Sequence, residues 1–116
     1  MTIFFRIAAI MGFLGVALGA FGAHMLKDLL ARNGLAHVWE KAVLYHLVHA
    51  VMLLVLASRT VVPALAWTLF FAGIVIFSGS LYLLAATNVR WFGAITPIGG
   101  LCLLAGWLAL VFKGLA

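Results

Sequence analysis

The chain has 116 residues, of which 68% are hydrophobic and only 8% are charged, and its seven Lys and Arg against two acids give a net charge of +5. Soluble domains carry about 25% charged residues, so this composition excludes a water-facing surface and indicates an integral membrane protein. The basic residues stand singly between apolar runs instead of clustering, which predicts anchors at lipid headgroups and no nucleic-acid binding.

Four apolar runs lie between the charged residues, and each is long enough to cross a membrane. They cover residues 3–23, 42–58, 63–86 and 92–112. At about 1.5 Å per residue, helices of about 17 to 25 residues match a hydrocarbon core of about 30 Å. The runs are continuous and do not alternate, which favours helices over a barrel. We therefore predict an all-α membrane protein, one domain over residues 1–116, with four transmembrane helices in an up-and-down bundle.

The first apolar run carries a stripe of small residues. After Ala8, glycines recur at spacings of three or four, as Gly12, Gly15, Gly19 and Gly22. Such a stripe lets another helix approach closely, and it predicts either packing within the chain, which we favour, or the seam of a homodimer. The run also resembles a secretory signal peptide, but its apolar part is long and residues 20–23 make a poor cleavage site, so we expect a retained span.

The longest linker, residues 24–41, contains an amphipathic segment. The three leucines of HMLKDLLARN share one helical face, and its basic residues lie off that face. This pattern predicts a short helix in loop 1 that lies in the membrane interface. The pair Asn33-Gly34 is a common helix stop, and Trp39 suits the aromatic belt that follows.

The second apolar run contains the block YHLVHA, in which polar side chains replace the expected leucines. Tyr45, His46 and His49 fall within one stripe of a helix, about 100° wide. Lys41 and Arg59 flank this run, so His49 lies within a few Å of the bilayer centre. Ionisable groups inside a membrane face the bundle interior or a cavity. We therefore predict that this stripe points inward.

The third and fourth runs supply hydroxyl groups at a comparable depth. They come from the blocks FSGSLY and TPIGG. In an up-and-down bundle these blocks fall in the half of the membrane nearest loops 1 and 3, as YHLVHA does, which predicts one polar cluster or cavity there. The candidate members of this cluster, or of a ligand site built from it, are Tyr45, His46, His49, Ser78, Ser80, Tyr82 and Thr96.

Gly99 and Gly100 of the fourth run are further candidates for helix packing. Beside them, Pro97 removes a backbone hydrogen bond to residue 93 if it already lies inside the helix. Proline is ordinary in the first turns of a helix. We therefore favour an ordinary helix start over a kinked or broken helix that lines a binding site.

The two membrane histidines lack the neighbouring side chains that a metal site or a catalytic site needs. His46 and His49 share a face, but no carboxylate lies inside any span and Cys102 is on another run. Asp28 and Glu40 are both in loop 1, so no nucleophile–base–acid set is spaced for catalysis. We predict no metal, no cofactor and no enzymatic activity. Neutral imidazoles that bond Ser78, Ser80, Tyr82 or a backbone carbonyl across helices are the favoured interpretation.

Five blocks, in order along nearly the whole chain, resemble a known family. They are GAFGAH (19–24), YHLVHA (45–50), FSGSLY (77–82), GAITPIGG (93–100) and GW (106–107). Together they resemble the small membrane-protein family catalogued as domain of unknown function 423, and the chain is similar also to the eukaryotic transmembrane protein 256 group. The resemblance implies a multi-pass protein of the bacterial inner membrane with four helices. It implies no activity.

Two functions remain open. The first is a non-enzymatic structural or assembly component, either a homodimer or a companion of another membrane protein. The alternative is a small carrier or channel that binds a small solute, an ion or a quinone-like ligand in the polar half. The small multidrug carriers have a similar length but depend on a membrane-embedded Glu in their first helix, which this chain lacks. Basic residues divide three against four between the two sides and predict no orientation.

Overall fold

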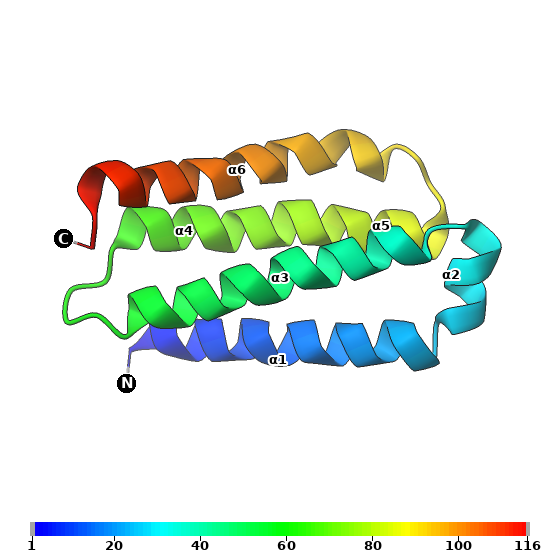
Figure 1. Ribbon diagram of the computed structural model, residues 1–116, viewed down its shortest axis with the longest axis horizontal. Helices are drawn as coiled ribbons and strands as arrows, with labels where there is room; N and C mark the ends of the chain where they lie inside the picture. The colour runs from blue at the N-terminus through cyan, green and yellow to red at the C-terminus, as the bar shows by residue number, and fades with distance from the viewer. Residues whose placement is uncertain (1, 116) are drawn as a thin grey trace.

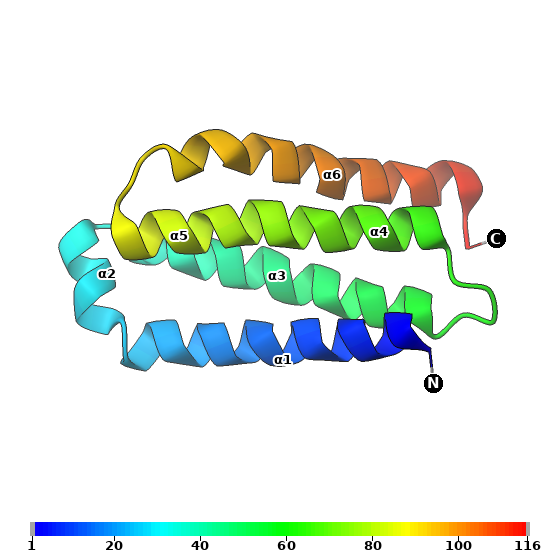
Figure 2. The same ribbon diagram turned by 180° about the vertical axis from the view of Figure 1, so that it is seen from behind.

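Four long helices run side by side in the computed structural model, which describes residues 2–115 (Figures 1 and 2). The four membrane crossings are Ile3–His24, Ala36–Ala57, Ala64–Thr87 and Phe92–Lys113, and each is long and apolar enough to span a membrane. The elements are α1 (Ile3–His24), α2 (Lys27–Asn33), α3 (Ala36–Ala57), α4 (Ala64–Gly73), η1 (Ile74–Ser78), α5 (Gly79–Thr87) and α6 (Phe92–Lys113). Successive crossings alternate in direction, so both termini lie at one end and α2 lies at the other. The predicted up-and-down bundle of four apolar helices is confirmed.

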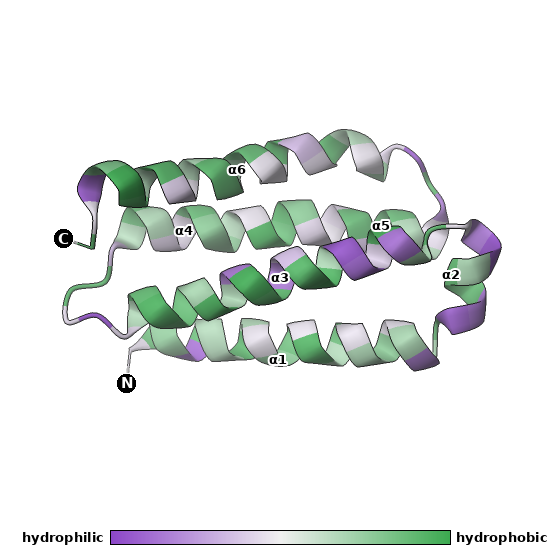
Figure 3. Cartoon of the chain, in the orientation of Figure 1, coloured by the Kyte–Doolittle hydropathy of each residue, from purple (hydrophilic) through white to green (hydrophobic). Residues whose placement is uncertain are grey.

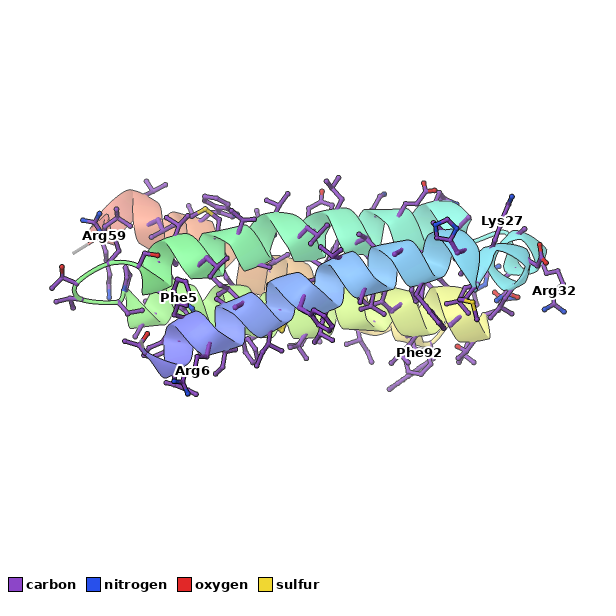
Figure 4. All side chains as sticks on the ribbon, turned by 90° about the horizontal axis from the view of Figure 1, so that it is seen from below. Phe5, Arg6, Lys27, Arg32, Arg59 and Phe92 are labelled. Atoms are coloured by element: carbon purple, nitrogen blue, oxygen red, sulfur yellow. The ribbon has the colours of Figure 1, made fainter. Side chains whose placement is uncertain are left out.

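Hydrophilic colour is strongest at the two ends of the bundle, and the middle is mostly hydrophobic apart from purple stretches on α3 (Figure 3). Figure 4 shows Arg6 and Arg59 at the end that holds the termini, and Lys27 and Arg32 at the end that holds α2. The outer surface between these ends carries large apolar side chains, such as Phe13, which is 71% exposed. A surface of this kind is suited to acyl chains and not to water.

Loop 1 contains the predicted short helix, α2, but the second crossing begins earlier than its apolar run. Gly34 ends α2 in the left-handed conformation, with φ of 68°. The backbone then turns back into a helix at Ala36, six residues before the predicted start at residue 42. No proline or glycine interrupts residues 36–57, so the helix extends beyond the apolar run and carries Glu40 and Lys41 on its projecting first turns.

The third crossing contains a π-helical segment, η1, that the sequence did not predict. Residues 74–78 form it, between Gly73 and Gly79. A π turn admits one extra residue, so the side chains that follow are rotated relative to those that precede it. The fourth crossing, by contrast, is continuous: Pro97 is the sixth residue of α6, and the helix runs on past it to Lys113.

The interior consists of two apolar clusters with a polar layer between them. The larger cluster, toward the termini, centres on Leu53, Leu56 and Phe70, which are fully buried. The smaller cluster, toward α2, contains Leu30, Trp39 and Ala85. The buried polar side chains lie between these clusters, and they are His46, His49, Ser78 and Ser80. Burial of a polar group is costly unless it finds a hydrogen-bond partner, and all four of these side chains find one, whereas the buried Trp67 indole N–H has none among residues 2–115.

Glycines bring neighbouring helices close together at several contacts. A Cβ on Gly15 would come within 2.6 Å of Leu47, and a Cβ on Gly19 within 3.2 Å of Val43. At Gly22 it would collide with the Trp39 indole. These three glycines therefore let α3 of the same chain lie close against α1.

Two of the predicted packing glycines differ from the rest. A Cβ on Gly12 would meet nothing within 4 Å, so Gly12 lies outside the α1–α3 contact although its spacing fits the stripe. In α6, a Cβ on Gly99 would collide with the backbone of Phe77, whereas one on Gly100 would sit at an ordinary 3.7 Å from the Phe77 ring. Close approach of α6 to η1 thus depends on Gly99 and not on Gly100.

Candidate functional site

His46 joins three helices. It lies on α3 and is 3% exposed. Its Nε2 lies 2.8 Å from the carbonyl oxygen of Met11 on α1, and its Nδ1 lies 2.9 Å from the hydroxyl of Tyr82 on α5. A carbonyl oxygen only accepts hydrogen bonds, so Nε2 carries the proton and donates it to Met11. In the neutral ring Nδ1 then accepts from the Tyr82 hydroxyl, and both nitrogens are bonded.

His49 links α3 to α6 through the opposite tautomer. The Trp107 indole N–H donates to His49 Nε2 at 3.0 Å. Because an indole nitrogen is a donor only, Nε2 must be the acceptor and Nδ1 must carry the proton. Nδ1 donates it to the Tyr45 carbonyl of the preceding turn at 2.7 Å. The ring is 4% exposed and also packs against Phe70, with centroids 5.3 Å apart.

The serines form separate bonds and do not touch the histidines. Ser78 donates to the Ala42 carbonyl on α3 at 2.8 Å. Ser80 donates to the Phe77 carbonyl at 2.9 Å, and its oxygen lies 2.6 Å from the Thr96 hydroxyl on α6. Ser80 and Thr96 each have one proton, and the Thr96 contact with the Phe92 carbonyl is the longer of their two backbone bonds, at 3.4 Å, so we assign Thr96 as the donor to Ser80. Of the partners expected for the histidines, the structure supplies Tyr82 and backbone carbonyls but neither serine.

Tyr45 lies at the surface of the bundle and not on its inward face. Its side chain is 41% exposed. The ring is nearly parallel to that of His49, with centroids 6.2 Å apart, and it lies 4.9 Å from the ring of Phe77. Tyr45 stands at the edge of the stripe predicted from helical periodicity, and the π segment brings Phe77 against that edge. The predicted inward orientation of Tyr45 is therefore corrected to a position at the edge of a groove.

The polar side chains do not enclose one cavity. They form four separate sets of bonds, which join α1, α3 and α5; α3 and α6; η1 and α3; and α5 and α6. The nearest cavity is a groove of about 540 Å³ on the side of the bundle, between α3, η1 and α6. It is largely apolar, and its lining includes Tyr45, His49, Phe77, Pro97, Leu104 and Trp107. The predicted polar cavity is thus replaced by bonded pairs beside an apolar groove.

Sequence reasoning missed Trp107 as the partner of His49. A signal was present, because an indole N–H deep in a membrane is costly to bury without an acceptor. Pro97, Gly100, Leu104 and Trp107 are also spaced three or four apart, so they share one face of α6. That face forms one wall of the groove.

Residues 2–115 offer no set of side chains that could ligate a metal ion. No group of three or more His, Cys, Asp or Glu side chains there could hold a metal ion. Both nitrogens of His46 and of His49 are already engaged, and the thiol of Cys102 is partly buried on α6. The arrangement cross-links helices through neutral hydrogen bonds.

Four apolar crossings with polar bonds between them and aliphatic side chains outside define a polytopic membrane protein, and the lipid bilayer is its environment. Comparison with known families gives a more specific identity. The chain belongs to the family described as "Protein of unknown function (DUF423)", which matches residues 18–100. The resemblance seen in the sequence blocks is confirmed.

The chain is similar to bacterial membrane proteins that match over nearly their whole length. A UPF0382 membrane protein of Staphylococcus epidermidis is 45% identical, and the match covers 99% of this chain and 97% of the relative. The UPF0382 membrane protein YwdK of Bacillus subtilis is 42% identical, over 96% of this chain and 94% of the relative. No solved structure matches the chain.

Proposed function

We propose that this chain is a non-enzymatic structural or assembly component of the bacterial plasma (inner) membrane, acting alone, as a homodimer or beside another membrane protein. The single observation that supports this function is the state of the two membrane histidines. All four of their ring nitrogens are bonded inside the chain. A histidine that ligates a solute or an ion needs a ring nitrogen that is free to bind it, whereas groups that fix the alignment of helices do not.

The experiment removes the side-chain group that donates a hydrogen bond to each histidine, while the donor residue keeps an aromatic ring. Tyr82→Phe deletes the hydroxyl at His46, and Trp107→Phe deletes the N–H at His49. Each variant is expected to lower the free energy of unfolding by about 1 kcal/mol, since the bond is lost and a buried acceptor stays unpaired. The measurement is unfolding in mixed micelles, with the amount of protein in the membrane fraction of cells as a second readout.

The proposal also predicts no flux. Vesicles that contain the purified protein are expected to match empty vesicles in proton and potassium leakage, and both variants are expected to do the same. Trp91→Phe serves as the matched control for the aromatic substitutions, because Trp91 is 66% exposed and bonds neither histidine. Protein-dependent leakage that Tyr82→Phe or Trp107→Phe abolishes would show a transport function instead.

A carrier or ligand-binding function is the second candidate, and the side groove favours it. The groove opens toward the acyl chains and has the volume of a small-molecule site, about 300 to 1,000 Å³. Its wall combines aromatic rings with the Tyr45 hydroxyl, which has no hydrogen-bond partner among residues 2–115. An apolar molecule with one polar ring substituent, such as a quinone-like ligand, suits this lining better than an ion does.

Tryptophan fluorescence tests the second candidate, because Trp107 lies in the groove wall. A short-chain benzoquinone is the probe. Binding predicts saturable quenching that Trp107→Phe removes and that Gly100→Leu, which fills the groove floor, weakens about tenfold or more. Gly12→Leu is the matched control, since a side chain there meets open space. Quenching that rises linearly, and equally in all variants, would mean simple partition into lipid.

A further inference from the structure

A second cavity lies at the end of the bundle that holds α2, away from the histidines. It has a volume of about 390 Å³ and lies between α1, α2 and α3. Its apolar wall includes Gly19, Gly22, Val43 and Leu30. The cavity adjoins the last turns of α1 and the first turns of α3, where the crossings reach the headgroup layer.

Two opposite charges line this one cavity. They are Lys27, on the first turn of α2, and Glu40, on the first turns of α3. Both side chains are exposed, and no ion pair within 4.0 Å joins charged side chains of residues 2–115. Lys27 and Glu40 therefore each retain their hydrogen-bonding capacity for a third molecule. Figure 4 shows Lys27 projecting at this end of the bundle.

The wall of the cavity is fixed before anything binds. Trp39 is 5% exposed and donates its indole N–H to the Leu18 carbonyl at 3.0 Å. Its ring also packs against Tyr82, with centroids 4.7 Å apart. Gly22 leaves room for the indole, because a Cβ there would collide with it. A preformed wall reduces the entropy lost on binding.

We propose that this cavity binds a phospholipid whose headgroup carries both a phosphate and a primary ammonium group. The Lys27 ammonium would take the phosphate, the Glu40 carboxylate would take the lipid ammonium, and the glycerol and upper acyl carbons would lie along the apolar wall. Opposite charges beside an apolar wall at headgroup depth match such a zwitterion. The charge-assisted bonds it makes are stronger than neutral ones.

The same groups disfavour the other common lipids. An anionic headgroup without an amine would meet the Glu40 carboxylate unpaired, which repels it. A quaternary ammonium headgroup has no N–H to donate to a carboxylate, and it is usually held by open aromatic faces. The Trp39 ring is buried and packed against Tyr82, so it offers no such face.

Native mass spectrometry and thermal unfolding of the detergent-solubilised protein test the site, with phosphatidylethanolamine, phosphatidylcholine and phosphatidylglycerol as probes. Phosphatidylethanolamine is expected to bind the unaltered protein about tenfold more tightly than the other two, and to raise the unfolding midpoint most. Glu40→Gln should abolish its preference over phosphatidylcholine. Lys27→Ala should weaken binding of all three lipids.

Asp28→Asn is the control, since Asp28 is on the same helix as Lys27 but does not line the cavity. Unfolding without added lipid shows whether each variant still folds, and all three substitutions change exposed side chains. Equal binding of phosphatidylethanolamine and phosphatidylcholine would overturn the proposal. So would tightest binding of phosphatidylglycerol, or an effect of Asp28→Asn as large as that of Glu40→Gln.

Discussion

Replacing Gly99 with alanine is expected to destabilise the protein by about 3 kcal/mol, the upper part of the range for overpacked interiors. The added methyl would collide with the backbone nitrogen and Cα of Phe77. A flexible side chain could swing away, but backbone can move only if α6 separates from η1. The collision would therefore spread along the whole contact between these two elements.

Two other glycines serve as controls for this prediction. Gly12→Ala adds a methyl to open space, and Gly100→Ala adds one at an ordinary contact distance from Phe77. Both are expected to leave stability unchanged or to raise it by about 0.5 kcal/mol, because alanine favours helix. Unfolding in mixed micelles measures all three. If Gly99→Ala proves as stable as Gly12→Ala, then α6 and η1 do not lie as close as described.

Removing both membrane histidines is expected to cost about 4 kcal/mol or more. In the variant His46→Ala, His49→Ala, two buried rings disappear, and each large-to-small change in a core typically costs about 2 to 5 kcal/mol. The Tyr82 hydroxyl and the Trp107 N–H also lose their acceptors. Their burial without partners adds a penalty of about 1 to 3 kcal/mol each, although the terms overlap and do not simply add.

The chain supplies a matched control for this variant as well. His24 and His37 are both exposed, so His24→Ala, His37→Ala removes the same two side chains and should change stability by less than about 0.5 kcal/mol. Single variants complete a double-mutant cycle. His46 and His49 share no hydrogen-bond partner but lie one helical turn apart, so the cycle measures how far their separate losses depart from the loss of the double variant. A double variant as stable as its control would remove the basis for a structural role.

The number of crossings could be predicted from the sequence because it depends on length and charge alone. A membrane-spanning helix must be apolar over its full thickness, and charges end it. The helix in loop 1 was also predictable, since its leucines share a face and Asn33-Gly34 ends it. The early start of α3 at Ala36 was missed because a helix continues past the hydrocarbon layer wherever no residue stops it.

The rotation of each crossing about its axis could not be predicted. In a soluble helix the apolar stripe marks the buried face, but here lipid-facing and inward-facing positions are equally apolar. His46 and His49 still pointed inward as expected, because buried polar groups are expensive in lipid. Tyr45 did not point inward, because it lies at the edge of the side groove, where an aromatic ring can remain exposed. The bond between Trp107 and His49 joins residues 58 positions apart and depends on two such rotations at once.

The π segment has a consequence for how the third crossing tolerates change in length. Phe70 before it and Ile74 at its start pack into the larger cluster, and after it Ser80 and Tyr82 reach α6 and α3. Deleting one residue within 74–78 would convert the segment to ordinary α-helix and leave the faces of α5 in place, because the π turn already absorbs one extra residue. Inserting one further residue there would instead turn every following side chain by about 100°, so the Ser80 and Tyr82 hydroxyls would lose their partners together.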